Sequence, residues 1–294
     1  MKTLIIKLGA LGDVVRTTVL LRELGGEIHW LTRGNATDLL GSSKIKKVYF
    51  FEDGKDKEMM EKEEFDLIVS LDEEREILEF LKKLKTKRII GIFLGKDGKI
   101  NYSPDSKYWF DMSLSSRLGK EKADELKKIN RKSVPQILIE MIGKNWSGQE
   151  YDIGISSKKS RGRIGLINVS TGTWPNKAWY GYNELAELLK KNKQDVIFLG
   201  MRQTLMEHIN DINGCEAIVC GDTLGMHIAL ALKKKVIAIF NCTSPDEIYD
   251  YGRMIKIVSP LYEKCFYSKE FSREAIEAIK AQEVYEAVKK ILKE

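Results

Sequence analysis

Short apolar runs alternate with helix-like segments along the whole chain, and this alternation limits the fold more than any other feature. The first run, residues 3–7, is followed by a glycine turn and then by an apolar-periodic stretch over 14–24. Strand, tight turn and helix in this order form half of a βαβ unit. The pattern therefore predicts an α/β fold with parallel sheets. The further expected strands are 28–31, 47–51, 67–71, 88–92, 164–169, 196–200, 217–220, 236–240 and 255–258.

The same pattern divides the chain into two α/β domains. The segment 155–163 is polar, basic and Gly/Ser-bearing, and a fresh strand begins directly after it. We therefore expect an N-terminal domain over 1–157 and a C-terminal domain over 158–294, with a last amphipathic helix packing on the body. The expected helices are 73–84, 120–142, 182–191, 204–212, 223–232 and 272–293.

Composition narrows the class of protein. A length of 294 residues with 43% hydrophobic and 31% charged residues excludes a largely disordered chain. The net charge of +6 is spread along the sequence, so nucleic acid is not an expected partner. The 4 cysteines lack CxxC spacing, and no apolar run is long enough to cross a bilayer. We expect a cytoplasmic protein; the basic run over 82–88 leaves peripheral membrane contact open, a solvated surface being the alternative.

Three polar clusters follow expected strands, where parallel sheets place their ligands. The first is KLGALGD over 7–13, which lacks the G-x-G-x-x-G fingerprint of dinucleotide binding, and the chain has no P-loop. Asp13 is either a carboxylate at a ligand site or a helix cap. The second, GDTLGMH over 221–227, begins a helix whose N–H groups could meet a phosphate, but Asp222 could simply cap that helix and His227 could be a core residue.

The third cluster lies over 170–179 and contains Lys177 between Trp174 and Trp179. Lys177 could neutralise a phosphate as a mobile point charge. The alternative is an ordinary surface loop that its two tryptophans hold in place.

Together these clusters resemble glycosyltransferase family 9, the lipopolysaccharide heptosyltransferases and their relatives. The matching stretches are KLGALGD at 7–13, WPNKAW at 174–179, GDT with His227 five residues after its Asp, and VIAIFNCTSP at 236–245. The resemblance covers nearly the whole chain, and the order and spacing of the motifs are specific. It implies the GT-B fold, with two Rossmann-like domains whose parallel sheets face each other across a cleft.

The resemblance also implies an activity and the residues for it. The expected enzyme is an inverting, metal-independent glycosyltransferase that moves a heptose-like sugar from an ADP-linked or other nucleoside diphosphate donor to a glycan or glycolipid hydroxyl of the cell envelope. Asp13 falls on the family's proposed catalytic base, and no cofactor and no metal ligand are expected. The acceptor-side residues are Gly9, Gly12 and Arg16. The donor-binding residues are Thr171, Gly172, Lys177, Gly200, Asp222, Thr223, Leu224, Gly225 and His227.

Two departures from the family pattern keep other functions open. Leu224 stands where the donor loop has a glycine, with Gly225 displaced by one position, and Asn241 replaces the glycine before the next turn. A non-catalytic nucleotide-sugar-binding relative would explain these changes. A sugar-nucleotide epimerase of similar two-domain design is the alternative among enzymes.

Overall fold

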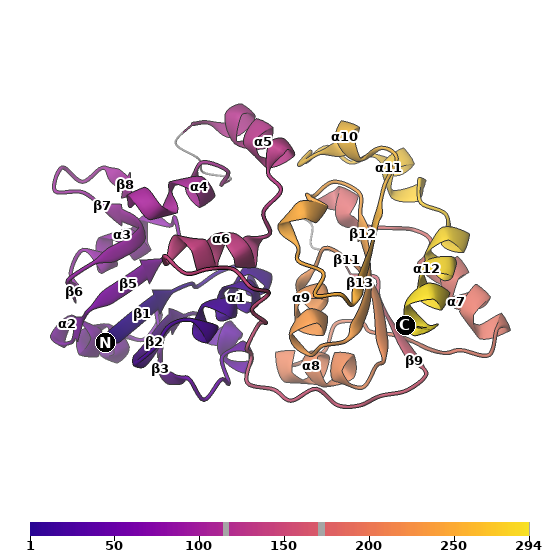
Figure 1. The fold of residues 1–294 in the computed structure, drawn as a ribbon, viewed down its shortest axis with the longest axis horizontal. Coiled ribbons are helices and arrows are strands. Elements are labelled where there is room, and N and C mark those ends of the chain that lie inside the picture. The colour runs from indigo at the N-terminus through magenta and orange to yellow at the C-terminus, as the bar shows by residue number, and fades with distance from the viewer. Residues whose placement is uncertain (114–117, 170–173, 294) are drawn as a thin grey trace. The chain divides into compact units, whose positions relative to one another are not determined.

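The computed structural model describes residues 1–113, 118–169 and 174–293. The chain divides into two compact units, Met1–Ile155 and Ser156–Glu294, which we call unit 1 and unit 2 (Figure 1). Each unit contains a sheet with helices on both faces, and the mixed α/β class that the sequence predicts is confirmed.

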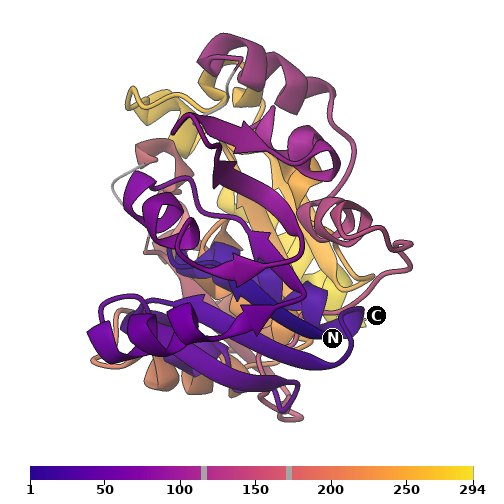
Figure 2. The same ribbon diagram turned by 90° about the vertical axis from the view of Figure 1, so that its left-hand side faces the viewer.

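Unit 1 has its main sheet in the order β3-β2-β1-β5-β7-β8, which can be followed in Figures 1 and 2. The neighbours are parallel except β7 and β8, which pair antiparallel. The strands of unit 1 are β1 (Lys2–Ile6), β2 (Glu27–Thr32), β3 (Ile45–Phe50), β4 (Glu64–Phe65), β5 (Leu67–Ser70), β6 (Lys85–Thr86), β7 (Ile89–Leu94) and β8 (Ile100–Tyr102). Its helices are α1 (Leu11–Thr17), α2 (Gly54–Lys62), α3 (Arg75–Leu81), α4 (Lys107–Phe110), α5 (Lys120–Ile129) and α6 (Val134–Met141), with 3-10 turns at Thr18–Arg22, Gly34–Leu39 and Pro104–Ser106.

Unit 2 has a parallel sheet in the order β10-β9-β11-β12-β13. Helices α7 and α12 cover one face, while α8 and α9 pack together on the other (Figure 1). The strands are β9 (Arg163–Ile167), β10 (Asp195–Phe198), β11 (Ala217–Gly221), β12 (Lys235–Phe240) and β13 (Met254–Val258). The helices are α7 (Tyr182–Lys191), α8 (Leu205–Asn213), α9 (Leu224–Ala231), α10 (Tyr262–Cys265), α11 (Arg273–Glu277) and α12 (Ala281–Lys293), with 3-10 turns at Pro175–Lys177 and Pro245–Glu247.

Apolar side chains on both faces of the strands build each core. In β1, Leu4 and Ile6 face α2 and α3, whose buried residues include Met60 and Phe80. In unit 2, Val219 and the other inward residues of the central strands pack against α7 and α12. Each sheet is thus buried on both faces, which explains why its central strands appear in the sequence as nearly continuous apolar runs.

Several predicted helices are shorter than expected, among them 73–84, which is α3 over Arg75–Leu81. The stretch 120–142 is two helices, because Pro135 has no N–H to donate and cannot continue a preceding helix, so α6 begins at Val134. The stretch 272–293 is also interrupted, and the carbonyl of Ile279 accepts from Trp179 Nε1 in the gap between α11 and α12. The first helix ends at Thr17 and continues as a 3-10 turn.

Candidate functional site

The carboxyl ends of β9 and β11 form the topological switch point of unit 2. From β9 the chain passes to β10 on one side and then returns to β11 on the other side. Ligands of open parallel sheets bind at such points. Lys177 follows β9 in the turn Pro175–Lys177, and Asp222 follows β11 directly, so the structure brings the second and third sequence clusters together at this point.

The turn that carries Lys177 is anchored by its neighbours in the WPNKAW motif. Asn176 is fully buried, donates through Nδ2 to Glu270 O at 2.7 Å and accepts the Ser272 N–H through Oδ1 at 2.8 Å. Trp179 is buried and donates to the Ile279 carbonyl at 2.9 Å. These anchors fix the backbone on either side of Lys177, so the segment is more than a surface loop held by tryptophans.

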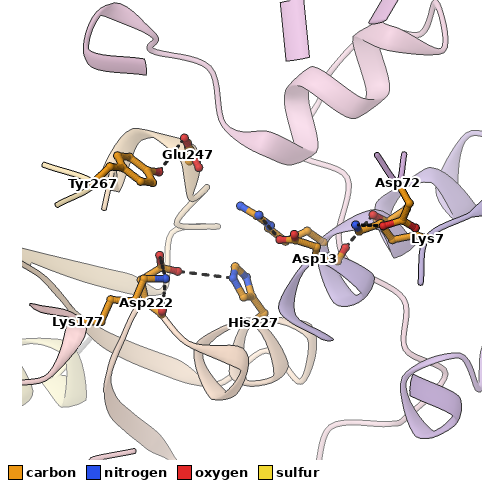
Figure 3. Close-up of polar contacts among 10 residues, drawn as sticks. Lys7, Asp13, Asp72, Lys177, Asp222, His227, Glu247 and Tyr267 are labelled. Atoms are coloured by element: carbon orange, nitrogen blue, oxygen red, sulfur yellow. Dashed lines mark hydrogen bonds and ion pairs between the residues drawn. The ribbon is translucent and has the colours of Figure 1, made fainter. Parts of the chain in front are cut away.

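Lys177 and Asp222 form an ion pair at the centre of the site (Figure 3). Lys177 Nζ donates to Asp222 Oδ2 and to the Asp222 carbonyl, both at 2.9 Å. The two side chains are only 17% and 15% exposed. An ammonium has three N–H donors, and these two bonds leave one for a further acceptor. Asp222 therefore fixes the position of the Lys177 ammonium and uses two of its three N–H donors.

Two residues bring the backbone of the Lys177 turn close to the sheet. A Cβ on Gly221 would lie 2.9 Å from the Lys177 carbonyl, so only glycine permits this approach. Asn241, which is buried, donates through Nδ2 to the Ala178 carbonyl at 2.7 Å. The asparagine that departs from the family pattern therefore anchors the backbone just after Lys177.

Helix α9 begins beside this pair. Thr223 is its N-cap residue and makes no side-chain cap bond, so Asp222 stands one position before the N-cap. Leu224 is the first residue of the helix, and Gly225 follows where a Cβ would meet Ile167 at 2.4 Å. The free N–H groups and the dipole of a helix N-terminus favour an anion at this place.

His227 lies one turn into α9 and is 4% exposed. Its Nε2 is 3.7 Å from Asp222 Oδ1, so Asp222 stands between a lysine and a histidine (Figure 3). Three side-chain oxygens in the segments that follow β11 and β12 are buried and have no hydrogen-bond partner in the described residues: Thr223 Oγ1, Asn241 Oδ1 and Thr243 Oγ1. Burial of a polar atom without a hydrogen bond costs free energy, which a ligand that bonds to the atom would recover.

Among the described residues, Gly200 is the predicted donor residue farthest from the pair in strand order. Gly200 is exposed and follows β10, an edge strand that β9 separates from β11. Thr171 and Gly172 lie outside the described residues.

Unit 1 places its own polar cluster at its switch point, between β1 and β5. The turn after β1 contains Gly9 and then Ala10, whose φ of 50° is unusual for a residue with a Cβ. Helix α1 follows, with Gly12 as its second residue and Asp13 as its third. The N-cap residue is Ala10, and the Asp13 carboxylate in the first turn of the helix pairs with Arg16.

Asp13 and Arg16 line a small hollow within unit 1 together with Lys7 and Trp109. Lys7 is held by Asp72, a residue that sequence reasoning missed: Lys7 Nζ donates to Asp72 Oδ1 at 2.7 Å. Asp72 comes shortly after the apolar run of β5, and β5 pairs with β1 in parallel. A carboxylate after the strand next to β1 was the available signal, but only knowledge of the strand order makes it useful.

Burial removes several other groups from consideration as acids or bases. It raises the pKa of the Cys242 thiol to about 12. Burial, reinforced by the negative charge of Glu247, also raises the pKa of Tyr267 well above its usual range. Both groups stay protonated near neutral pH, and the Tyr267 hydroxyl donates to Glu247 Oε1 at 3.1 Å. The acid and base candidates near the two switch points are therefore carboxylates and His227.

The family model described as glycosyltransferase family 9 (heptosyltransferase) matches residues 149–278. The chain is similar to glycosyltransferase family 9 over this stretch. The resemblance stated from the sequence is confirmed there, and the stretch contains the Lys177–Asp222 pair, α9 and Asn241. The family is one of sugar-transferring enzymes. No curated protein matches the chain.

Solved structures extend the likeness over the whole chain. The Escherichia coli heptosyltransferase WaaC with ADP is 12% identical, with coverage of 99% of this chain and 100% of the other and a TM-score of 0.68. The E. coli ADP-heptose lps heptosyltransferase II is 16% identical, with coverage of 99% and 98% and a TM-score of 0.66. A family 9 glycosyl transferase from Veillonella parvula is 13% identical, with coverage of 99% and 97% and a TM-score of 0.64. The fold is thus the GT-B fold of the heptosyltransferases, as the resemblance predicts.

Residues 1–113, 118–169 and 174–293 contain no group of three or more His, Cys, Asp or Glu side chains arranged to hold a metal ion. Over the same residues, no helix combines the length and the apolar character needed to cross a bilayer.

Proposed function

We propose that this protein is an inverting glycosyltransferase that moves a heptose-like sugar from an ADP-linked donor to a hydroxyl of a cell-envelope glycan or glycolipid. The observation that carries the proposal is the Lys177–Asp222 pair beside the N-terminus of α9, at the switch point of a family 9 domain. Similar structures contain ADP and ADP-2-deoxy-2-fluoro heptose, which supports this choice of donor.

Unit 2 would bind the donor. Lys177 and the free N–H groups of α9 supply positive charge for a pyrophosphate, and the buried oxygens of Thr223 and Thr243 can accept from hydroxyls. Leu224 and Gly225 would contribute backbone rather than side-chain contacts, so the displaced glycine does not remove the anion site. His227 and Asp222 would orient the donor through their polar atoms. We keep Thr171, Gly172 and Gly200 as proposed donor residues from the resemblance alone.

Unit 1 would bind the acceptor. Asp13 is the proposed general base, which takes the proton of the acceptor hydroxyl as its oxygen bonds to the anomeric carbon and the bond to the nucleoside diphosphate breaks. Arg16 fixes the Asp13 carboxylate, and we keep Gly9 and Gly12 as proposed acceptor-side residues from the resemblance alone. The negative charge that develops on the leaving group falls to Lys177 and α9, so we propose that no metal is needed.

The four cysteines are free thiols and all are buried, which agrees with a reducing compartment. We therefore propose that the enzyme works on the cytoplasmic side of the envelope, with peripheral membrane contact as part of acceptor capture.

Calorimetry with ADP and turnover with ADP-heptose test the proposed function. We expect ADP to bind the wild type and Lys190→Ala alike, because Lys190 is an exposed lysine of α7 in the same unit. Sugar transfer should require an added acceptor. Conversion of the donor sugar without any acceptor would indicate the epimerase, and tight ADP-heptose binding without transfer to any envelope glycan would indicate the non-catalytic relative.

A further inference from the structure

Asp72 is placed where it can control the turn that leads to Asp13. Its side chain is 6% exposed and follows β5 at the switch point of unit 1. One oxygen accepts from Lys7 Nζ at 2.7 Å, and the other accepts the Leu8 N–H at 2.5 Å. A single carboxylate thus bonds two consecutive residues at the end of β1 (Figure 3).

The turn that follows needs such an external hold. Ala10 has a φ of 50°, a conformation that L residues seldom adopt and that persists only when the surroundings impose it. Ala10 is also the N-cap of α1 and can supply no side-chain cap. Because Asp72 fixes the backbone at Leu8, the chain enters the Gly9–Ala10 turn from a set position, and Asp13 comes three residues after Ala10.

We propose that Asp72 is a positioning residue for sugar transfer, which clamps the β1–α1 turn so that Asp13 and Lys7 keep their places around the unit 1 hollow. This inference rests on the proposed function, in which Asp13 is the base. Asp72 acts through Leu8 N–H and Lys7 and touches no reacting atom, so its loss is expected to change the rate of transfer rather than the binding of the donor by unit 2.

The chain offers a matched control at the opposite end of the same strand. Asp66 accepts the Lys2 N–H at 2.7 Å and Lys87 Nζ at 2.6 Å, so it too joins a backbone N–H and a lysine to one carboxylate. It lies at the amino end of β1, away from the turn. A general effect of losing such a clamp should appear in both variants, whereas an effect on Asp13 should appear only at Asp72.

The experiment compares Asp72→Asn and Asp72→Ala with Asp66→Asn and Asp66→Ala. Hydrogen exchange should become faster over residues 8–17 in the Asp72 variants and stay unchanged there in the Asp66 variants. The kcat of transfer should fall roughly 10- to 100-fold for the Asp72 variants, since a shift of about 1 Å in a reacting group costs on this scale. The KM for the donor and the affinity for ADP should remain within about twofold of the wild type.

Unchanged exchange over 8–17, or equal losses of kcat at Asp66 and Asp72, would overturn the inference. Asp72→Asn keeps the shape of the side chain and serves if Asp72→Ala does not fold. The proposed function fails separately: wild-type turnover in Asp13→Asn would remove its base. If the wild type transferred no sugar at all, the exchange result would still decide whether Asp72 clamps the turn, and the catalytic part of the inference would fall with the proposed function.

Discussion

Both units carry a lysine–aspartate pair at the switch point of their sheet, but the two pairs are built in opposite ways. In unit 1 the carboxylate is the hub, since Asp72 accepts from both Lys7 Nζ and the Leu8 N–H. In unit 2 the ammonium is the hub, since Lys177 donates to both the side chain and the carbonyl of Asp222. The first arrangement fixes a turn, whereas the second fixes a cation.

The surroundings of the two pairs follow the same division. Beside Lys7 lies another internally neutralised pair, Asp13 with Arg16. Beside Lys177 lie a helix N-terminus and buried oxygens without partners in the described residues. The arginine holds the Asp13 carboxylate in place and ionised, while unsatisfied donors and acceptors suit a polyanionic ligand with hydroxyl groups. This difference supports the proposal that unit 1 supplies the base and unit 2 binds the donor.

The largest expected effect comes from Asp13→Asn in unit 1. It should lower transfer by about 10²–10⁴-fold, because the variant keeps the shape of the side chain but cannot take a proton. ADP affinity should stay nearly unchanged, since unit 2 is the proposed donor-binding unit. The measurements are turnover with a competent donor and acceptor, and calorimetry with ADP.

Asp124→Asn is the matched control, because Asp124 also pairs with a cation on its own helix, Lys120 of α5. It should transfer sugar like the wild type. Full activity in Asp13→Asn would show that Asp13 is not the base.

A smaller effect is expected from Lys177→Ala in unit 2. A charge-assisted hydrogen bond contributes about 1.5–3 kcal/mol, so ADP affinity should fall roughly 10- to 150-fold. Adenosine affinity should change much less, because the proposed partner of Lys177 is the pyrophosphate. Calorimetry of both ligands on Lys177→Ala and on the exposed-lysine control Lys190→Ala makes the test; equal losses for ADP and adenosine would assign Lys177 a structural role.

Sequence patterns predicted the parallel strands of the two larger sheets because a strand buried on both faces must be apolar along its length. They missed β8, a short strand of partly exposed residues that pairs antiparallel after the Gly95–Lys99 turn, and the two-residue strands β4 and β6, which pair with each other. They also treated 120–142 and 272–293 as continuous helices. The first stretch contains Pro135, which weighs little in an amphipathic pattern, and the gap in the second holds a carbonyl that accepts from Trp179, 100 positions away in the sequence.

The candidate site shows the same limit. The resemblance to family 9 indicated Lys177, Asp222 and His227 from the sequence, because each belongs to a short contiguous motif. It could not identify Asp72, which meets Lys7 across 65 positions of sequence, nor the anchor from Asn176 to Ser272 across 96 positions. Such partners are fixed by strand order and packing, and neither is visible in the local sequence.

Asn241→Ala should have a modest effect that sharpens the description of unit 2. The hydrogen bond from Asn241 Nδ2 to Ala178 O holds the turn after Lys177, and one such bond contributes about 0.5–1.5 kcal/mol. ADP affinity should fall roughly threefold to tenfold, less than in Lys177→Ala. The control is Asn192→Ala, whose Nδ2 donates to Leu188 O on the surface of α7. An Asn241→Ala variant with wild-type ADP affinity would show that ADP binding does not need the hydrogen bond from Asn241 to Ala178.

The smallest expected effect is that of excess EDTA, which should leave both ADP binding and transfer unchanged. Lys177 and the α9 N-terminus supply positive charge for the pyrophosphate within unit 2. A divalent cation is therefore not needed to neutralise the pyrophosphate. Calorimetry and turnover with and without the chelator measure this, with a known Mg²⁺-dependent transferase as the control for chelation. Loss of transfer that Mg²⁺ or Mn²⁺ restores would contradict the proposal. Asp222 would then be the first residue to test as a metal ligand, because its carboxylate lies next to both Lys177 and His227. A metal ion bound there would displace the Lys177 ammonium from the carboxylate.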